Sequence, residues 1–298
     1  MTDPVPVAVP RKGRPLEAVL ERLASTAEAD HLVDEISATL RYEKAVTKDR
    51  QTPDRDVYER LADYSDLADP TAPEYTLLRD DREGKPRRIV FDSAVVECDG
   101  VDLHLVGREE PFRALRTHEF ALGFDSADLV LEEVVGLREE GLEDLSDVNA
   151  RIDPRDTDVR VVTGLGDTVY HTLMATPETL PAGADLDRAF VADYEGPLCI
   201  SPRYERLVEA VLGTDAIEGT TFAYPDPGEE EEAAIARAGL GVYLTVTGST
   251  ARDEGLVLGD HLFPSETVLM ENAAESSAAV ERALDRLTAE PLETAIEV

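Results

Sequence analysis

Four consecutive residues, Thr247, Gly248, Ser249 and Thr250, have the composition of a phosphate-binding loop. Glycine lets the backbone turn so that successive N–H groups converge on an anion, and three hydroxyl groups add further donors. A short helix predicted at 251–254 would direct its positive end toward the same place. An ordinary turn between two elements explains the same residues, so this loop needs support from elsewhere in the chain.

The residues before this loop predict a strand that ends at it. Val242, Leu244 and Val246 alternate with Tyr243 and Thr245, as in a strand with one buried face. The candidate loop therefore falls at the carboxyl end of a strand.

A second candidate, Lys12, Gly13 and Arg14, lies between a predicted strand at Val5–Val9 and a predicted helix at Leu16–Leu23. The helix is indicated by apolar residues spaced three and four apart. Cations beside a glycine at the end of a first strand suit phosphate binding, whereas the alternative is a basic linker exposed to solvent. The chain has only four lysines, at positions 12, 44, 48 and 85, so a lysine in this loop is notable.

These two loops resemble parts of the ATP phosphoribosyltransferase of histidine biosynthesis. The first is similar to that family's Lys-Gly-Arg-Leu loop, with Pro15 inserted before the leucine. In the second, Thr247, Gly248 and Thr250 match the Thr-Gly-any-Thr core of its phosphoribosyl-pyrophosphate loop. Three further segments resemble the family: a strand ending in Arg108, residues 121–133 with Ser126, and residues 263–272.

The resemblance implies an α/β fold with two lobes, of the periplasmic-binding-protein type II kind, with the ligand cleft between the lobes. We expect one lobe at 1–153 plus 262–298, with an insertion at about 36–92, and the other lobe at 154–261. This arrangement would bring Lys12 and Arg14 toward the loop at 247–250.

The resemblance also implies a phosphorylated small-molecule substrate, phosphoribosyl pyrophosphate, and transfer of its phosphoribosyl group to ATP or a related nucleotide. Lys12, Gly13, Arg14 and Arg108 would contact pyrophosphate together with Mg²⁺, the loop at 247–250 would hold the 5-phosphate, and Ser126 would face the ligand. No catalytic acid, base or protein metal ligand is assigned.

Two positions differ from the family's pattern and leave other functions open. Tyr243 and Val246 stand where the family carries acidic residues before the loop. A non-catalytic protein that binds or senses a phosphorylated metabolite is one alternative. An interaction protein that uses the insertion as a partner surface is another.

Three other patterns suggest weaker sites. Residues 163–168 contain Gly-any-Gly after a strand but have Val169 at the third glycine position, which favours a second anion loop over a dinucleotide fingerprint. Asp125 and Asp128 would attract Mg²⁺ by outer-shell contacts or form a solvated turn. The five histidines lack metal-ligand spacing, so we interpret them as structural.

Composition indicates where the protein works. The 29 basic and 64 acidic residues give a net charge of −35, which suits a halophilic cytoplasm because molar salt shortens the Debye length to about 3 Å. The sequence has no basic stripe that would bind nucleic acid, so we expect no nucleic-acid partner. No apolar run reaches membrane-spanning length, and the amino terminus does not resemble a signal peptide. The sequence is compatible with a homo-oligomer and does not decide the oligomeric state.

The remaining pattern predicts alternating strands and helices. We interpret Cys98 and Cys199 as reduced, buried thiols. A charged stretch at 49–83 predicts a helical insertion followed by a loop. Further strands are predicted at 88–91, 103–106, 120–124 and 159–163, and further helices at 208–212 and 278–287.

Overall fold

The computed structural model describes residues 4–27, 29–66, 68–69, 71–79, 87–98, 100–134, 146–226 and 229–289. The chain divides into two compact units. Unit 1 comprises Met1–Asp125, Pro154–Asp167 and Thr267–Glu297, and unit 2 comprises Ser126–Asp153 and Thr168–Glu266. The predicted boundaries differ because strand pairing assigns residues 154–167 to unit 1, whereas 126–153 and 262–266 belong to unit 2.

Unit 1 contains a seven-stranded sheet in the order β2-β3-β4-β1-β5-β12-β6. Its central strand β1 is buried along most of its length, so its apolar residues are not limited to alternate positions. The strands are β1 (Val5–Pro10), β2 (Glu74–Arg79), β3 (Arg87–Cys98), β4 (Val101–Arg108), β5 (Leu122–Ser126), β6 (Val159–Gly164) and β12 (Thr267–Asn272).

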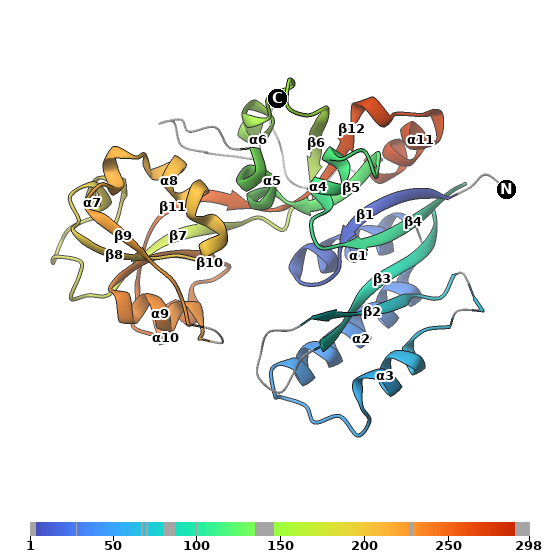
Figure 1. Ribbon diagram of the computed structural model, residues 1–298, viewed down its shortest axis with the longest axis horizontal. Helices are drawn as coiled ribbons and strands as arrows, with labels where there is room; N and C mark the ends of the chain where they lie inside the picture. The colour runs from blue at the N-terminus through green and yellow to red at the C-terminus, as the bar shows by residue number, and fades with distance from the viewer. Residues whose placement is uncertain are drawn as a thin grey trace. The chain divides into compact units, whose positions relative to one another are not determined.

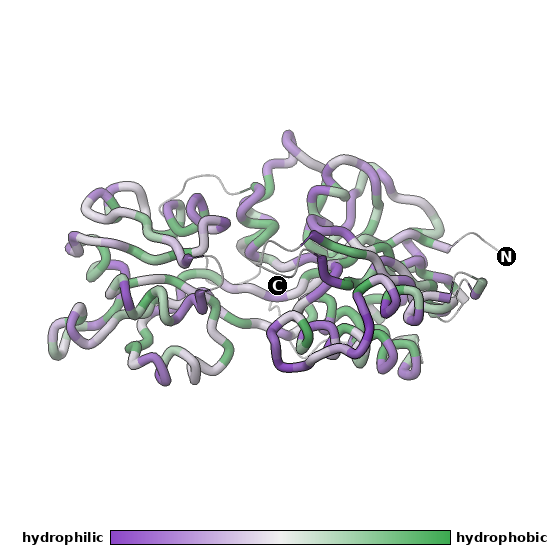
Figure 2. Tube along the Cα trace, turned by 60° about the horizontal axis from the view of Figure 1, so that its bottom comes forward, coloured by the Kyte–Doolittle hydropathy of each residue, from purple (hydrophilic) through white to green (hydrophobic). Residues whose placement is uncertain are grey.

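The helices of unit 1 cover this sheet with apolar stripes. Leu16, Val19, Leu20 and Leu23 of α1 are all buried at the three- and four-residue spacing that predicted the helix. Figure 2 shows hydrophobic stretches in the interior and hydrophilic residues at many of the outer turns. The helices are α1 (Arg14–Ala27), α2 (Asp30–Thr47), α3 (Val57–Tyr64), α4 (Pro111–Arg116) and α11 (Ala278–Leu287), and the bounds of α11 are those predicted.

The insertion at about 36–92 contributes α3, β2 and parts of α2 and β3 to unit 1. A buried ion pair fastens α3 to α2: Arg60 Nε and Nη2 donate to the two carboxylate oxygens of Glu43 at 2.7 and 2.9 Å, and Tyr64 Oη also donates to Glu43. The helix expected within 49–83 is therefore present, but Glu74–Arg79 form an edge strand instead of a loop.

Unit 2 contains a five-stranded sheet in the order β11-β7-β10-β8-β9. Figure 1 shows α9 and α10 on one side of this sheet and α7 and α8 on the other. The strands are β7 (Val169–Ala175), β8 (Gly196–Cys199), β9 (Thr220–Ala223), β10 (Leu240–Thr245) and β11 (Val257–Ser265). The helices are α5 (Ala127–Val134), α6 (Ser146–Arg151), α7 (Arg188–Ala192), α8 (Glu205–Leu212), α9 (Glu231–Ala238) and α10 (Ser249–Asp253).

Cys98 and Cys199 are both buried and neither forms a disulfide bond, which agrees with the prediction of buried thiols. None of the helices in the described part of the chain combines the length and the apolar character needed to cross a bilayer.

Candidate functional site

The loop from Thr247 to Thr250 has an accessible set of hydroxyl groups. Gly248 adopts a left-handed conformation with φ +67° and is buried, whereas Thr247, Ser249 and Thr250 are exposed. Thr247 Oγ1 lies 3.0 Å from Ser249 Oγ. Arg252 Nη1 donates to the backbone oxygen of Thr247 at 2.8 Å and so fixes the start of the loop. The loop therefore presents hydroxyls from a backbone whose turn requires glycine.

The strand before this loop ends one residue earlier than the alternating pattern predicts. Val242 is buried, but Val246 is 75% exposed and lies outside β10. The last strand residue, Thr245, is fixed by its hydroxyl, which lies 2.6 Å from Thr172 Oγ1. Tyr243 is partly buried, and this burial raises the pKa of its phenol, which therefore stays neutral at physiological pH.

The loop of Lys12, Gly13 and Arg14 joins β1 to α1, as predicted. Gly13 has φ +82°, so glycine is again required for the turn. Lys12 Nζ lies 3.7 Å from a carboxylate oxygen of Glu109, and both side chains are more than two-fifths exposed.

Arg14 is held by a network that the sequence did not indicate. Its Nη1 donates to the backbone oxygen of Asp167 at 2.7 Å and also to the Asp167 carboxylate. The same carboxylate accepts the backbone N–H of Thr267 at 2.7 Å and its hydroxyl at 2.8 Å. Asp167 is 153 residues from Arg14: the pairing of β6 with β12 brings Asp167 beside Thr267, and the packing of α1 against β12 brings Arg14 to the same place.

Arg108 lies at the end of β4, where the strand was predicted to place it. Its guanidinium carbon lies 4.8 Å above the Phe120 ring, and its Nε is 4.0 Å from a Glu119 oxygen. A cation stacked on an aromatic face keeps its charge while its orientation is restricted.

Ser126 ends β5 in the interior of the protein. It is 4% exposed, and its hydroxyl lies 2.8 Å from Ser265 Oγ. In this structure the hydroxyl therefore serves an internal hydrogen bond.

The expected solvated turn at 125–128 is wrong, because Asp125 and Asp128 are each only 2% exposed. Asp125 accepts the backbone N–H of Phe112. Asp128 Oδ2 lies 2.9 Å from His171 Nε2 and accepts the Tyr204 hydroxyl at 2.8 Å. These hydrogen bonds outweigh the effect of burial and lower the pKa of Asp128 to about 2.

The same burial decides against Asp125 and Asp128 as contacts for Mg²⁺. Both carboxylates are enclosed and already accept hydrogen bonds from the protein, so they do not fit even an outer-shell role. Within the described residues, Glu230, Glu231 and Glu232 form a cluster of carboxylates within 4.8 Å of one another, and they lie near the surface in a strongly acidic chain.

Residues 163–168 make internal contacts in place of an open anion loop. Asp167 binds Arg14, as described above, and Thr168 Oγ1 donates to Glu266 at 2.5 Å. The carboxylates of Asp167, within this segment, and of Glu266, beside it, would repel an anion.

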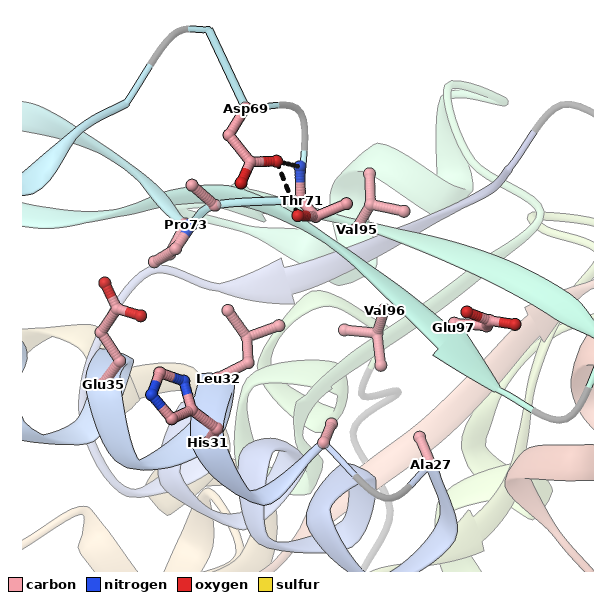
Figure 3. A pocket seen from close by; sticks show the side chains of 12 residues that line it. Ala27, His31, Leu32, Glu35, Asp69, Thr71, Pro73, Val95, Val96 and Glu97 are labelled. Carbon is pink, nitrogen blue, oxygen red and sulfur yellow. Dashed lines mark hydrogen bonds between the residues drawn. The ribbon is translucent and has the colours of Figure 1, made fainter.

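Two pockets among the described residues of unit 1 differ in charge. The larger, of about 1000 Å³, lies beside the start of α2, the end of β3 and the segment before β2. Figure 3 shows Glu35, Asp69 and Glu97 around it, together with His31. The smaller, of about 300 Å³, adjoins the Lys12–Gly13 loop and is lined by several cations.

The two sheets share a strand order. Each sheet contains three parallel strands, of which the first in the chain lies in the middle: β4-β1-β5 in unit 1 and β9-β8-β10 in unit 2. Two further strands follow on the same side, β12-β6 in unit 1 and β7-β11 in unit 2. Two α/β units with this order, between which the chain passes repeatedly, define a two-lobed protein of the periplasmic-binding-protein type II class. The predicted fold class is thereby confirmed.

The chain belongs to the family of halobacterial ATP phosphoribosyltransferases, whose family model matches residues 1–298. This membership confirms the resemblance seen in the two loops. Among curated protein sequences, none matches this chain.

Several solved structures are similar at low identity. The ATP phosphoribosyl transferase (HisG:HisZ) complex from Thermotoga maritima matches with TM-score 0.44 and 14% identity, over 95% of this chain and 96% of that chain. A Gly52Ala mutant of arginine-bound ArgBP from the same organism matches with TM-score 0.36 and 11% identity, over 63% and 76%. A probable amino-acid transporter extracellular-binding protein from Bacillus subtilis gives 0.37 and 11%, over 63% and 75%.

Proposed function

We propose that this protein binds phosphoribosyl pyrophosphate and transfers the phosphoribosyl group to ATP or a related nucleotide in the cytoplasm, as a step of histidine biosynthesis. Family membership over residues 1–298 carries this proposal. The exposed hydroxyls around Gly248 support it, because they are suited to a phosphate.

In the proposed reaction, the bond between the ribosyl carbon and pyrophosphate breaks as a base nitrogen of the acceptor forms a new bond to that carbon. Pyrophosphate leaves with the bonding electrons, and positive charge develops on the ribosyl group. Such a reaction depends on positioning and on stabilising the leaving charge more than on a protein acid or base.

The loop from Thr247 to Thr250 is assigned to the 5-phosphate. Lys12 and Arg108, which lie beside the solvent-accessible carboxylates of Glu109 and Glu119, are assigned to the pyrophosphate, which carries Mg²⁺ as the family suggests. Arg14 acts mainly by holding the loop of Lys12 and Gly13 to Asp167, because its guanidinium already donates hydrogen bonds to Asp167.

A non-catalytic role in binding a phosphorylated metabolite is the second candidate. It is favoured by Tyr243 and Val246, which occupy positions where acidic residues were expected: one is a partly buried neutral phenol and the other an exposed apolar side chain. Neither side chain can accept a hydrogen bond as a carboxylate does, so an interaction of roughly 1.5–3 kcal/mol with a ribose hydroxyl would be missing.

The test is release of pyrophosphate from phosphoribosyl pyrophosphate and Mg²⁺, with and without ATP, in molar potassium chloride. We expect ATP-dependent release by the native chain, strong loss in Thr250→Ala, and little change in the control Thr221→Ala, another exposed threonine of unit 2. Saturable binding without release would favour the non-catalytic role. Absence of both binding and release would refute the assignment of phosphoribosyl pyrophosphate.

A further inference from the structure

The smaller pocket of unit 1 gathers cations from three separate parts of the chain. Lys12 comes from the loop after β1, Lys44 and Lys48 from the end of α2, and Arg88 from the start of β3. The whole sequence has only four lysines and a net charge of −35, yet three of those lysines line this one pocket. Positive charge is therefore concentrated at this pocket in a chain that is otherwise strongly acidic.

The acidic side chains at the pocket are already engaged. Glu43 uses both carboxylate oxygens to accept hydrogen bonds from Arg60, and Glu17 lies 3.8 Å from Lys44. Arg88 differs from these side chains, because its Nε is buried and has no hydrogen-bond partner among the residues that the structure describes. A buried donor of this kind is stabilised by an acceptor, which an anionic ligand would supply.

The floor of the pocket is apolar. Leu16, Ile89 and Val90 are at most 3% exposed, and Leu40 completes the surface with a partly buried side chain. The volume of about 300 Å³ is at the small end of the range for ligand sites. Small-molecule sites commonly combine an apolar surface with charged groups that fix the orientation of the ligand.

Helix stabilisation explains only part of this arrangement. Lys44 and Lys48 lie near the carboxyl end of α2, where cations complement the helix dipole. The dipole does not explain why Lys12 and Arg88, on two other elements, line the same hollow.

We propose that this pocket binds a small organic phosphate, with the phosphate on Lys48 and Arg88 and an apolar or aromatic body on the floor formed by Leu16, Leu40, Ile89 and Val90. The ligand makes these contacts with residues of the insertion and with α1, so the site is distinct from the loop at 247–250. The pocket binds its ligand whether or not the protein is a transferase.

The test is calorimetric titration of the full chain in 1 M potassium chloride with three separate probes: AMP, ribose 5-phosphate and inorganic phosphate. At this ionic strength the Debye length is about 3 Å, so a change of affinity reports direct contact and not the overall charge. We expect AMP to bind most tightly, because it alone offers an aromatic ring to the apolar floor. Tightest binding of ribose 5-phosphate or inorganic phosphate would overturn the assignment of the floor.

Two variants and two controls locate the binding. Lys48→Glu and Arg88→Gln should each weaken AMP at least tenfold, because each removes a charged contact. Arg41→Glu reverses a charge at an exposed position of α2 that does not line the pocket, and it should leave the affinity unchanged. Thr250→Ala should remove only AMP that the loop at 247–250 holds, and it should leave the binding at the pocket intact. Circular dichroism of every variant verifies that it is folded.

The opposite pattern would refute the proposal. AMP affinity that survives both pocket variants, or that falls only in Thr250→Ala, would assign the ligand elsewhere, and absence of AMP binding would remove it altogether. Failure of pyrophosphate release, with pocket-dependent AMP binding intact, would refute the transferase activity alone.

Discussion

The loop around Gly13 in unit 1 and the loop around Gly248 in unit 2 each join a strand to a helix through a glycine at positive φ, +82° and +67°. Their surroundings differ. The first loop carries cations that face protein carboxylates, Lys12 toward Glu109 and Arg14 toward Asp167. The second carries exposed hydroxyls, of which two lie within hydrogen-bond distance of each other. The same local geometry thus produces a charged anchor in one unit and an accessible polar surface in the other.

The largest expected difference concerns the two glycines themselves. A Cβ at Gly248 would overlap the Leu258 side chain, whereas a Cβ at Gly13 would meet nothing closer than Pro15 Cδ at 3.8 Å. Gly248→Ala should lower the free energy of unfolding by about 2–3 kcal/mol, and Gly13→Ala by about 1–2 kcal/mol from backbone strain alone. Chemical denaturation in molar potassium chloride measures both. Equal losses would show that Leu258 moves aside freely.

The second prediction concerns Asp128, the buried carboxylate that stabilises the interior of unit 2. Its folded-state pKa of about 2 lies below the unfolded value, so its stabilisation is complete above about pH 4 and is lost as the pH falls toward 2. The shift corresponds to about 2 kcal/mol. Asp128→Asn should therefore flatten the pH dependence of unfolding between pH 4 and 2. Identical pH profiles for the variant and the native chain would contradict this role.

The smallest effects separate the two cations of the first loop. Arg14→Ala should cost about 1–2 kcal/mol of stability, because it breaks a partly buried network with Asp167. Lys12→Ala should cost no more than about 0.5 kcal/mol, since its ion pair is exposed. Thermal unfolding compares the two variants, and calorimetry with phosphoribosyl pyrophosphate should give the reverse order of affinity loss. A larger stability loss in Lys12→Ala would contradict the assignment of Arg14 as the anchor.

Local patterns located many of the elements. The strand at Val5, the helix containing Leu16 and the helix at Ala278–Leu287 were predicted because apolar residues recur with the period of the element they form. The glycine loops at 13 and 248 were found for a related reason, since a glycine after a strand marks a turn that other residues form at a cost.

Other features depend on pairing between distant residues and were missed. The edge strand Glu74–Arg79 was interpreted as a loop, because its charged surroundings hide a strand that pairs with β3. The turn at 125–128 was predicted to be solvated, but His171 and Tyr204 supply the hydrogen bonds that permit Asp128 to be buried. A carboxylate's environment is set by partners that the local sequence does not contain.

By itself the sequence determined the α/β class, the two glycine turns, the acidic surface and the resemblance to a family, since each depends on residues close together or on composition. Only the tertiary structure decided that Arg14 is held by Asp167, that Ser126 faces the interior, and that three of the four lysines line one pocket. The reason is physical: period and turn preference act over a few residues, whereas burial and ion pairing depend on which distant strands become neighbours in a sheet.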